Sequence, residues 1–308
     1  MRRVLKFLAR LLLIAALAAV AVGLYKREEL MRLWTVNTLF DAENIVGNFS
    51  HMDRAFLTVE VPRGPGPASP LPGGAPADLP AAVDRWIEAR AVTSLLVLHE
   101  DRVVHESYHR GTGADDRRVS WSVAKSFLSA LMGTLVDDGT IPDLDVPVTD
   151  YVPRLAGSAY DGATIRDVLQ MASGVRFDED YLDYDSDINR MGREIALGGA
   201  LDDFTAALSE TDNPPGETWQ YVSIDTHVIG MVIRAATGRD IPALMSERVI
   251  APLGLQSTPY YITDGEGVAF VLGGLNLTTR DYARLGMMYL NDGRWNGRRR
   301  ERRVRRAR

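Results

Sequence analysis

The stretch WSVAKS, residues 121–126, opens a predicted helix, and the rest of the chain is organised around it. Ser122 and Lys125 are three residues apart, so on a helix they share one face, one turn apart. A hydroxyl is a weak nucleophile at neutral pH unless a base takes its proton, and a partly desolvated lysine can be that base. In the first helical turn the Ser122 backbone N–H has no helical partner and is available to an oxyanion. The same pattern also fits an ordinary amphipathic helix with Ser122 as its N-cap, so the catalytic interpretation needs a second motif.

The second motif is YVS at 221–223, which follows the turn residues at 214–216 and opens another predicted helix. A serine–lysine pair needs a third group to carry the proton to the leaving group, and a tyrosine can do so. Ser122, Lys125 and Tyr221 are therefore the candidate catalytic residues.

Around these motifs the apolar pattern predicts a mixed α/β (α+β) fold. Two apolar runs, 93–99 and 103–109, are joined by three polar residues and predict a β-hairpin. An apolar stripe at helical spacing predicts a helix over 122–137, with Gly139 at its C-terminal end. Further helices are predicted at 83–90, 164–171, 201–208, 223–237, 242–250 and 279–290. Residues 173–200 show no clear period and are expected to form a loop that frames the site.

The bulk composition limits the class of protein. The chain has 308 residues, of which 46% are hydrophobic and 25% charged, as in ordinary globular proteins. There is no cysteine, which excludes disulfides, thiol nucleophiles and cysteine metal sites. The net charge is −6, but residues 298–308 hold eight arginines and one glutamate, so residues 1–297 carry −13. An acidic body argues against nucleic acid as the partner.

The N-terminus is predicted to direct the protein out of the cytoplasm. Four basic residues within 1–10 precede an uncharged apolar run from Leu11 to Tyr25. This pattern is typical of an export signal, and AVA at 19–21 offers a cleavage site. The alternative is an uncleaved membrane anchor that uses residues 7–25. We therefore expect residues 1–30 to be a signal peptide or anchor, and the protein to be periplasmic or membrane-anchored with its domain outside the cytoplasm.

The remaining organisation follows from composition. Residues 31–61 mix apolar and polar side chains and are assigned to an N-terminal extension. Residues 62–80 contain seven prolines and several glycines, which predicts an extended linker without a core of its own. The domain itself is expected to span 81–297.

Two other kinds of active site are not supported by the sequence. The five histidines show no metal-binding spacing, and no Gly-x-Ser-x-Gly elbow is present. We expect no metal and no cofactor.

Several motifs, in the same order, make the chain similar to the serine β-lactamase and penicillin-recognising superfamily. The similarity is greater to the class C-like branch that includes the 6-aminohexanoate-dimer hydrolases, and it runs over roughly 84–297. The motifs that carry it are SWSVAKS at 120–126, LQMASGV at 169–175, DY at 180–181 with SDI at 186–188, PGETWQYVS at 215–223 and DYARLG at 281–286.

This resemblance implies a fold and a set of roles. The fold would be β-lactamase and penicillin-binding transpeptidase-like, with an antiparallel sheet flanked by helices and a helical region. Ser122 would be the acylated nucleophile, Lys125 its base and Tyr221 the proton shuttle. Ser223 would steady the Lys125–Tyr221 network by hydrogen bonding, and Tyr181 would lie on a loop that closes over the substrate.

The C-terminal part departs from the superfamily pattern. Its third motif, Lys- or His-Thr/Ser-Gly or a Gly-rich equivalent on an edge strand, has no match after Tyr221. The strands expected to pair with the hairpin should follow residue 297, but the chain becomes the Arg-rich stretch 298–308. We interpret that stretch as an out-of-frame tail, with a basic arm for lipid or nucleic acid as the alternative. On this interpretation the sheet lacks its C-terminal strands and activity is doubtful.

The sequence thus predicts an exported serine hydrolase that cleaves an amide or ester bond in a small molecule. One alternative is a β-lactamase or D-alanyl-D-alanine carboxypeptidase-type enzyme, and another is a non-catalytic envelope binding protein. Substrate identity is left open because members of such superfamilies differ mainly in loops such as 173–200.

Overall fold

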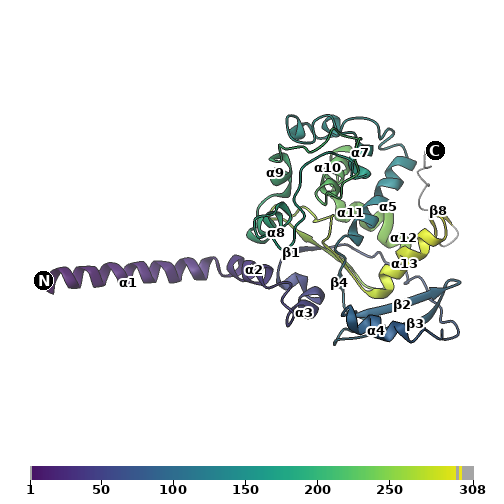
Figure 1. The fold of residues 1–308 in the computed structure, drawn as a ribbon, viewed down its shortest axis with the longest axis horizontal. Helices are drawn as coiled ribbons and strands as arrows, with labels where there is room; N and C mark the ends of the chain where they lie inside the picture. Colours follow the sequence, from purple (N-terminus) through teal and green to yellow (C-terminus); the bar gives the residue numbers. More distant parts are fainter. Residues whose placement is uncertain (1, 296–297, 300–308) are drawn as a thin grey trace.

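The computed structural model describes residues 2–295 and 298–299, and Figure 1 shows a helical rod leading into a mixed α/β body. The α-helices are α1 (Arg2–Tyr25), α2 (Arg27–Asn37), α3 (Ile45–Ser50), α4 (Ala82–Ala89), α5 (Val123–Asp137), α6 (Val148–Tyr151), α7 (Ile165–Leu169), α8 (Asp187–Leu197), α9 (Leu201–Ala206), α10 (Asp225–Thr237), α11 (Ile241–Met245), α12 (Ala251–Leu253) and α13 (Thr279–Leu290). Short 3₁₀ turns lie at Met52–Arg54 and Pro153–Leu155, and a π turn at Ser246–Ile250. The strands are β1 (Leu57–Glu60), β2 (Ser94–His99), β3 (Arg102–Tyr108), β4 (Arg118–Val119), β5 (Tyr260–Thr263), β6 (Leu275–Leu277), β7 (Arg294–Trp295) and β8 (Arg298–Arg299).

The largest sheet is antiparallel and has the order β1-β5-β6-β4. Its register pairs Leu57 with Thr263, Tyr260 with Asn276, and Arg118 with Leu277. Strand β1 belongs to the stretch assigned to an N-terminal extension, so this sheet includes residues that precede position 81. The edge strand β4 leads directly into the WSVAKS stretch, which places the candidate nucleophile at one border of the sheet.

The predicted hairpin is confirmed. Strands β2 and β3 pair antiparallel, from Ser94 opposite Tyr108 to His99 opposite Arg102. Within the described residues no other named strand joins this pair, although Gly73 makes a single bridge to Val103. The hairpin is fastened to α13 by an ion pair between Arg280 and Glu106 at 2.6 Å.

The core is built around α5 and α10, which lie side by side in the body (Figure 1). Helix α10 buries nine consecutive residues, from Asp225 to Ile233, and α5 buries eight. Such continuous burial is typical of a helix enclosed on all sides rather than an amphipathic surface helix. Both helices end as the sequence predicts, because Gly139 and Gly238 have φ of +80° and +64°, which glycine adopts without strain.

The prediction that all of 173–200 is a loop is wrong for residues 187–197, which form α8. The Ser186 side chain caps its N-terminus and Gly198 ends it in the left-handed conformation. Ile188, Met191 and Ile195 point into the core with helical spacing. That stripe was hidden by the neighbouring Gly, Asp and Tyr residues, and only 173–186 remain a loop.

The Pro-rich segment 62–80, predicted as an extended linker, makes contacts with the body. Ser69 is buried, and its backbone N–H donates to the carbonyl of Gly254 at 2.8 Å. Gly74 N–H donates to the Val103 carbonyl on the hairpin at 2.9 Å. Residues 62–80, the Pro-rich strap, therefore run along the surface of the body and are attached to it by hydrogen bonds.

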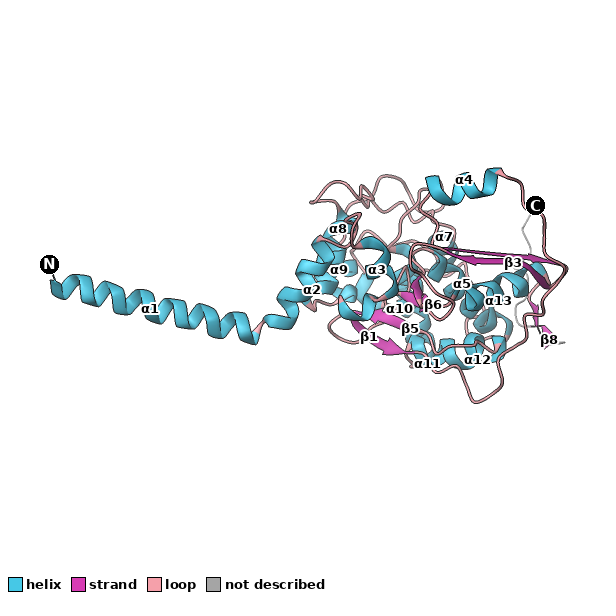
Figure 2. Ribbon diagram, turned by 90° about the horizontal axis from the view of Figure 1, so that it is seen from below, coloured by secondary structure: helices cyan, strands magenta, loops and turns pink. Residues whose placement is uncertain are grey.

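Helix α1 extends away from the body, as Figures 1 and 2 both show. None of its residues is buried, and by length and composition it is the one helix in the described part of the chain that could cross a membrane. A signal sequence has the same properties. The Arg-rich tail at 298–308 lies outside the described residues, apart from Arg298–Arg299, whose backbone forms β8 beside β7.

Candidate active site

The turn before Ser122 is held by the sheet and by aromatic packing. Ser120 N–H continues the β4–β6 pairing with a 2.7 Å hydrogen bond to the Leu275 carbonyl. Trp121 has φ of +42°, a conformation that a bulky residue rarely adopts without support. Its ring is stacked by Phe40 at 5.8 Å and met edge-on by Phe49 at 5.4 Å. The segment that carries Phe40 and Phe49 thus stabilises the turn that presents Ser122.

The structure brings together the three predicted catalytic side chains. The Ser122 hydroxyl oxygen lies 2.7 Å from the Tyr221 hydroxyl oxygen and 3.2 Å from the Lys125 ammonium nitrogen. The Lys125 nitrogen also lies 5.4 Å from the centre of the Tyr221 ring. Ser122 occupies the N-cap position of α5, but its side chain makes no capping bond. The hydroxyl is therefore bonded to Lys125 and Tyr221 rather than to the helix end, unlike an ordinary N-cap serine.

Lys125 is placed to act as a base. Its ammonium group donates to the Leu272 carbonyl at 2.8 Å, in addition to Ser122. Burial lowers the pKa of Lys125 from its usual value, while the nearby Tyr221 and the charge of Glu179 act in the opposite direction. A lower pKa increases the fraction of neutral lysine, the form that accepts a proton.

Tyr221 is held at the mouth of the site by the segment before it. The Gln220 N–H donates to the Met171 carbonyl at 2.9 Å, and the Gly216 N–H donates to the Ala172 carbonyl at 2.7 Å. Gly174 lets these two segments lie close together, because a Cβ at that position would lie 2.0 Å from the Asn213 carbonyl oxygen. Tyr221 is 37% exposed and Ser122 is exposed, so a substrate can reach both hydroxyl groups from solvent.

Ser223 has a different partner from the expected one. Its N–H donates to one carboxylate oxygen of Glu179 at 2.6 Å, and its hydroxyl donates to the other at 3.1 Å. The expected hydrogen bond from Ser223 to Lys125 or Tyr221 is not found among the bonds of the described residues. Ser223 is connected to the network through Glu179 instead.

Tyr181 lies on the loop before α8 and is 56% exposed. Its hydroxyl donates to Glu179 at 3.4 Å, a weak hydrogen bond. Burial of the phenol, aided by the charge of Glu179, raises the pKa of Tyr181 to about 12. The structure thus places Tyr181 beside Glu179, and its contact with substrate remains a prediction.

Sequence reasoning missed three contributors to this site: Glu179, the Leu272 carbonyl and the Phe40–Phe49 pair. Glu179 directly precedes the DY motif, but nothing in its local pattern distinguishes it from the acidic residues around it. Leu272 precedes the pair Gly273-Gly274, which was the available signal. A Cβ at Gly274 would lie 2.8 Å from the Phe270 carbonyl oxygen, so this tight turn requires glycine.

Among residues 2–295 and 298–299, no group of three or more His, Cys, Asp or Glu side chains is arranged to hold a metal ion. The polar side chains that converge at the site are those of Ser122, Lys125 and Tyr221.

Comparison with known proteins identifies the class to which this arrangement belongs. The family model described as Beta-lactamase matches residues 83–308. The chain is 34% identical over 217 residues to the 6-aminohexanoate-dimer hydrolase of Paenarthrobacter ureafaciens, covering 68% of this chain and 55% of that protein. It is 30% identical over 161 residues to the esterase EstB of Burkholderia gladioli, covering 48% of this chain and 39% of EstB. The chain therefore spans about half the length of these curated relatives or less.

Solved structures agree on the fold. A Bacillus anthracis protein described as a candidate 6-aminohexanoate-dimer hydrolase superposes with a TM-score of 0.77 at 22% identity, covering 85% of this chain and 73% of that one. A penicillin-binding protein from Bacillus halodurans superposes with a TM-score of 0.52 at 18% identity, covering 68% and 74%. These similarities confirm the predicted fold class, an antiparallel sheet flanked by helices in the β-lactamase and penicillin-binding arrangement.

Proposed function

Because this chain belongs to the Beta-lactamase family, we propose that it is a serine hydrolase that cleaves an amide or ester bond through an acyl-enzyme on Ser122. The observation that carries the proposal is the position of the Ser122 hydroxyl, 2.7 Å from Tyr221 and 3.2 Å from Lys125. These distances lie within the range in which a nucleophile and its base share a proton.

The proposed reaction has two halves. The Ser122 oxygen attacks the substrate carbonyl carbon, and its proton moves to the network formed by Lys125 and Tyr221. The Ser122 N–H, which makes no hydrogen bond to the described part of the chain, donates to the developing oxyanion. When the intermediate collapses, Tyr221 returns a proton to the leaving amine or alcohol and the acyl group stays on Ser122. In the second half, water gives up a proton to the same network and attacks the acyl carbon. The bond between that carbon and the Ser122 oxygen then breaks, the network returns the proton to the Ser122 oxygen, and the acid leaves.

The names of the relatives support an amide or ester as the substrate. The curated relatives include the 6-aminohexanoate-dimer hydrolase, the esterase EstB and the D-aminopeptidase of Cereibacter sphaeroides. We take from these names only the bond class, since the chain covers 25% of the D-aminopeptidase and about half of the first relative.

We further propose that the catalytic domain lies outside the cytoplasm. Support comes from α1, whose apolar, unburied length suits either an export signal or a membrane anchor. In either case the small-molecule substrate would be found in the envelope or outside the cell.

The proposed activity is tested by pre-steady-state hydrolysis of p-nitrophenyl acetate, with the Ser122→Ala variant as control. We expect a burst of p-nitrophenol close to the enzyme concentration and an acetyl group on the peptide that contains Ser122. The variant should show neither. Absence of both burst and adduct in the wild type would contradict the proposal and favour a non-catalytic binding protein.

The same protein incubated with benzylpenicillin distinguishes the two enzymatic alternatives. Rapid turnover of penicillin would indicate a β-lactamase, and a long-lived penicilloyl adduct on Ser122 would indicate a carboxypeptidase-type enzyme. We expect that penicillin is neither hydrolysed nor attached to Ser122 at a rate comparable with the hydrolysis of p-nitrophenyl acetate.

A further inference from the structure

We propose that Glu179 is a positioning residue of this site: its carboxylate, bonded to Ser223, fixes the Tyr221–Ser223 segment and acts on Lys125 as a negative charge. The inference rests on the proposed function of Ser122, Lys125 and Tyr221, and assigns to it a fourth side chain. Glu179 does not touch Ser122 and so takes no direct part in bond making.

Glu179 and Ser223 are joined by two hydrogen bonds. Both carboxylate oxygens are used, one by the Ser223 N–H at 2.6 Å and the other by the Ser223 hydroxyl at 3.1 Å. Ser223 is 1% exposed, and its neighbours Val222 and Ile224 are also buried. Hydrogen bonds from buried donors to a charged acceptor are among the stronger ones in proteins. They fix the backbone two residues after Tyr221 and thereby the direction of its side chain toward Ser122.

Glu179 is itself held by the start of α8. On one side, the Asp178 N–H donates to the Asp187 carboxylate at 2.9 Å, and the Ile188 N–H donates to the Asp178 carbonyl at 3.1 Å. On the other side, the Asn189 side chain donates to the carbonyls of Tyr181 at 3.1 Å and Asp183 at 2.7 Å. The backbone is therefore fixed before and after Glu179, as a positioning role requires.

Few titratable groups in the described part of the chain act on Lys125. The groups that act on Lys125 are Tyr221, from the segment before α10, and Glu179, from the loop before α8. In the described part of the turn before β6, the Leu272 carbonyl is the group that accepts a hydrogen bond from Lys125. Glu179 also acts on Tyr181 and on the buried Asp225. Glu179 is thus the carboxylate that favours the charged form of Lys125, against the burial that lowers its pKa.

Burial and the charge of Glu179 act in opposite directions on the pKa of Lys125, so removal of the charge has a measurable consequence. Replacing Glu179 by Gln keeps the shape of the side chain and its capacity to bond both groups of Ser223, but removes the charge. Without that charge the ammonium form of Lys125 is less favoured, so the pKa of Lys125 should fall further below its usual value. A purely structural role for Glu179 would not move the titration of Lys125 in this direction.

The chain offers a direct way to observe this titration, because it contains three lysines: Lys6, Lys26 and Lys125. Full-length protein labelled with ¹³C at lysine Cε and held in detergent micelles should give three lysine signals. Lys125→Met assigns the signal of interest. We expect its midpoint to lie below those of the other two lysines in the wild type, and lower still in Glu179→Gln.

Asp180→Asn is the matched control. Asp180 is the next residue, is exposed, and its carboxylate accepts a hydrogen bond from the Leu182 N–H rather than from Ser223. This variant should leave the Lys125 midpoint unchanged. A midpoint that is the same in Glu179→Gln as in the wild type, or that rises, overturns the inference.

Phosphonylation of Ser122 by a fluorophosphonate, in which the serine oxygen displaces fluoride from phosphorus, is followed against pH and separates this inference from the proposed function. The acid limb of the plot of labelling rate against pH should move to lower pH in Glu179→Gln. Ser223→Ala keeps the charge of Glu179, so it should lower the plateau of the rate without moving the acid limb. A wild type in which Lys125 titrates as expected but Ser122 is never phosphonylated would overturn the proposed function alone. A wild type that is phosphonylated on Ser122, with the same acid limb of the pH profile in Glu179→Gln, would overturn the role of Glu179 alone.

Discussion

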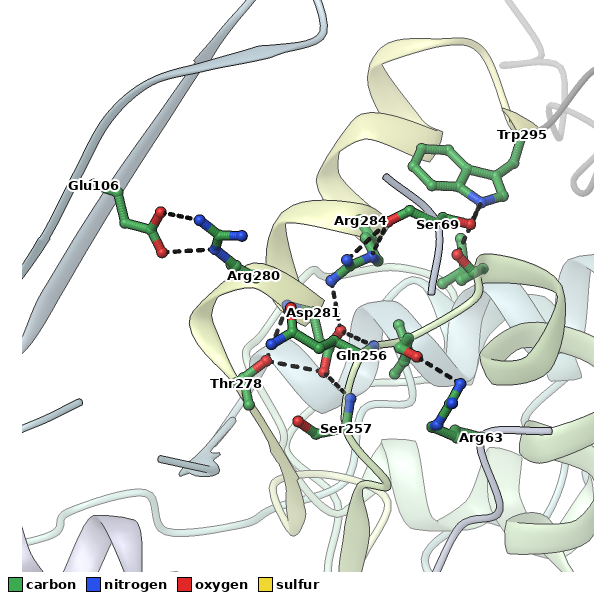
Figure 3. A network of polar contacts seen from close by, with 12 residues as sticks. Arg63, Ser69, Glu106, Gln256, Ser257, Thr278, Arg280, Asp281, Arg284 and Trp295 are labelled. Atoms are coloured by element: carbon green, nitrogen blue, oxygen red, sulfur yellow. Dashed lines mark hydrogen bonds and ion pairs between the residues drawn. The ribbon is translucent and has the colours of Figure 1, made fainter. Parts of the chain in front are cut away.

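Two polar clusters in this molecule are built from similar groups but differ in exposure. The first is the catalytic cluster, Ser122, Lys125 and Tyr221, in which the serine is exposed and the tyrosine is 37% exposed. The second is the α13 network around Asp281 and Arg284, which are 1% and 3% exposed (Figure 3). One cluster presents its polar atoms to solvent, and the other withdraws them from it.

In the α13 network the carboxylate is fully used. Asp281 accepts hydrogen bonds from the N–H groups of Gln256 at 2.7 Å and Ser257 at 3.1 Å, and from the Thr278 hydroxyl at 2.9 Å. Arg284 bonds Asp281 at 2.8 Å and donates twice to the Ser69 carbonyl. The network therefore connects α13 to the segment before β5 and to the Pro-rich strap.

The difference in exposure predicts a different role for each cluster. A buried charge is tolerated when its bonding capacity is met by fixed partners, and removing one partner leaves the other uncompensated. The Ser122 hydroxyl has two hydrogen-bond partners, Tyr221 and Lys125, and an open side, which suits a group that must exchange a proton and a bond. The α13 network should therefore control stability, and the catalytic cluster should control rate.

The largest expected effect is on rate, at Tyr221. Tyr221→Phe removes the hydroxyl that lies 2.7 Å from Ser122 and keeps the ring over Lys125. Acylation of Ser122 should slow by about 10²- to 10⁴-fold, the usual contribution of a proton-transfer group. The melting temperature should change little, because Tyr221 is partly exposed. A loss of stability without a loss of rate would reverse the assignment of roles.

The next effect is on stability, at Asp281. Asp281→Ala leaves Arg284 buried without its carboxylate and removes three further hydrogen bonds. We expect the free energy of unfolding in urea to fall by about 3–5 kcal/mol. The fraction that remains folded should be acylated at the wild-type rate. A slower rate in folded protein would show that the two clusters are coupled.

A smaller effect, dependent on pH, is expected at Asp225, which belongs to neither cluster. Asp225 is fully buried, accepts hydrogen bonds from Tyr160 at 2.8 Å and Ser173 at 2.9 Å, and has a pKa that burial raises to about 7. In the unfolded chain an aspartate titrates near pH 4. Between about pH 4 and 7 the folded protein thus holds a proton that the unfolded chain has lost, so stability falls as pH rises.

Asp225→Asn should remove this pH dependence. Denaturation at pH 5 and pH 8 should show a wild type that loses on the order of 1–4 kcal/mol relative to the variant across the interval. Parallel pH profiles for the two proteins would contradict the raised pKa.

The smallest effect is expected for an exposed ion pair that resembles the Asp281–Arg284 pair only in composition. Arg239 and Glu247 lie 2.9 Å apart with side chains 43% and 53% exposed. Glu247→Gln should change the free energy of unfolding by less than about 1 kcal/mol. A larger change would mean that burial does not explain the stability effect expected at Asp281.

The parts of the fold that the sequence predicted are those set by local patterns. The hairpin β2–β3 joins runs that are adjacent in the chain, and α13 begins and ends at the predicted residues. The resemblance implied an antiparallel sheet, but the individual strands of the four-stranded sheet were not located from the sequence, since they are two to four residues long and pair across long separations, as β1 does with β5. Strands this short carry no readable alternation.

The candidate site was predictable where residue types and spacing carry the chemistry. Ser122, Lys125 and Tyr221 came from two motifs and a family resemblance, and the structure places their polar atoms in contact. Glu179 could not be selected from the acidic residues at 178–187, because only its contact with Ser223 distinguishes it. Phe40 and Phe49 were equally invisible, since their packing on Trp121 depends on the fold of an N-terminal segment distant in sequence.

Covalent labelling of the native chain with a fluorophosphonate, followed by peptide mass spectrometry, shows directly whether Ser122 is the nucleophile. If Lys125 and Tyr221 activate Ser122, the folded protein should carry one adduct, on the peptide that contains Ser122. That adduct should be lost in Ser122→Ala and after denaturation in urea. A folded protein without an adduct, or with the adduct on another serine, would contradict the assignment of Ser122 as the nucleophile.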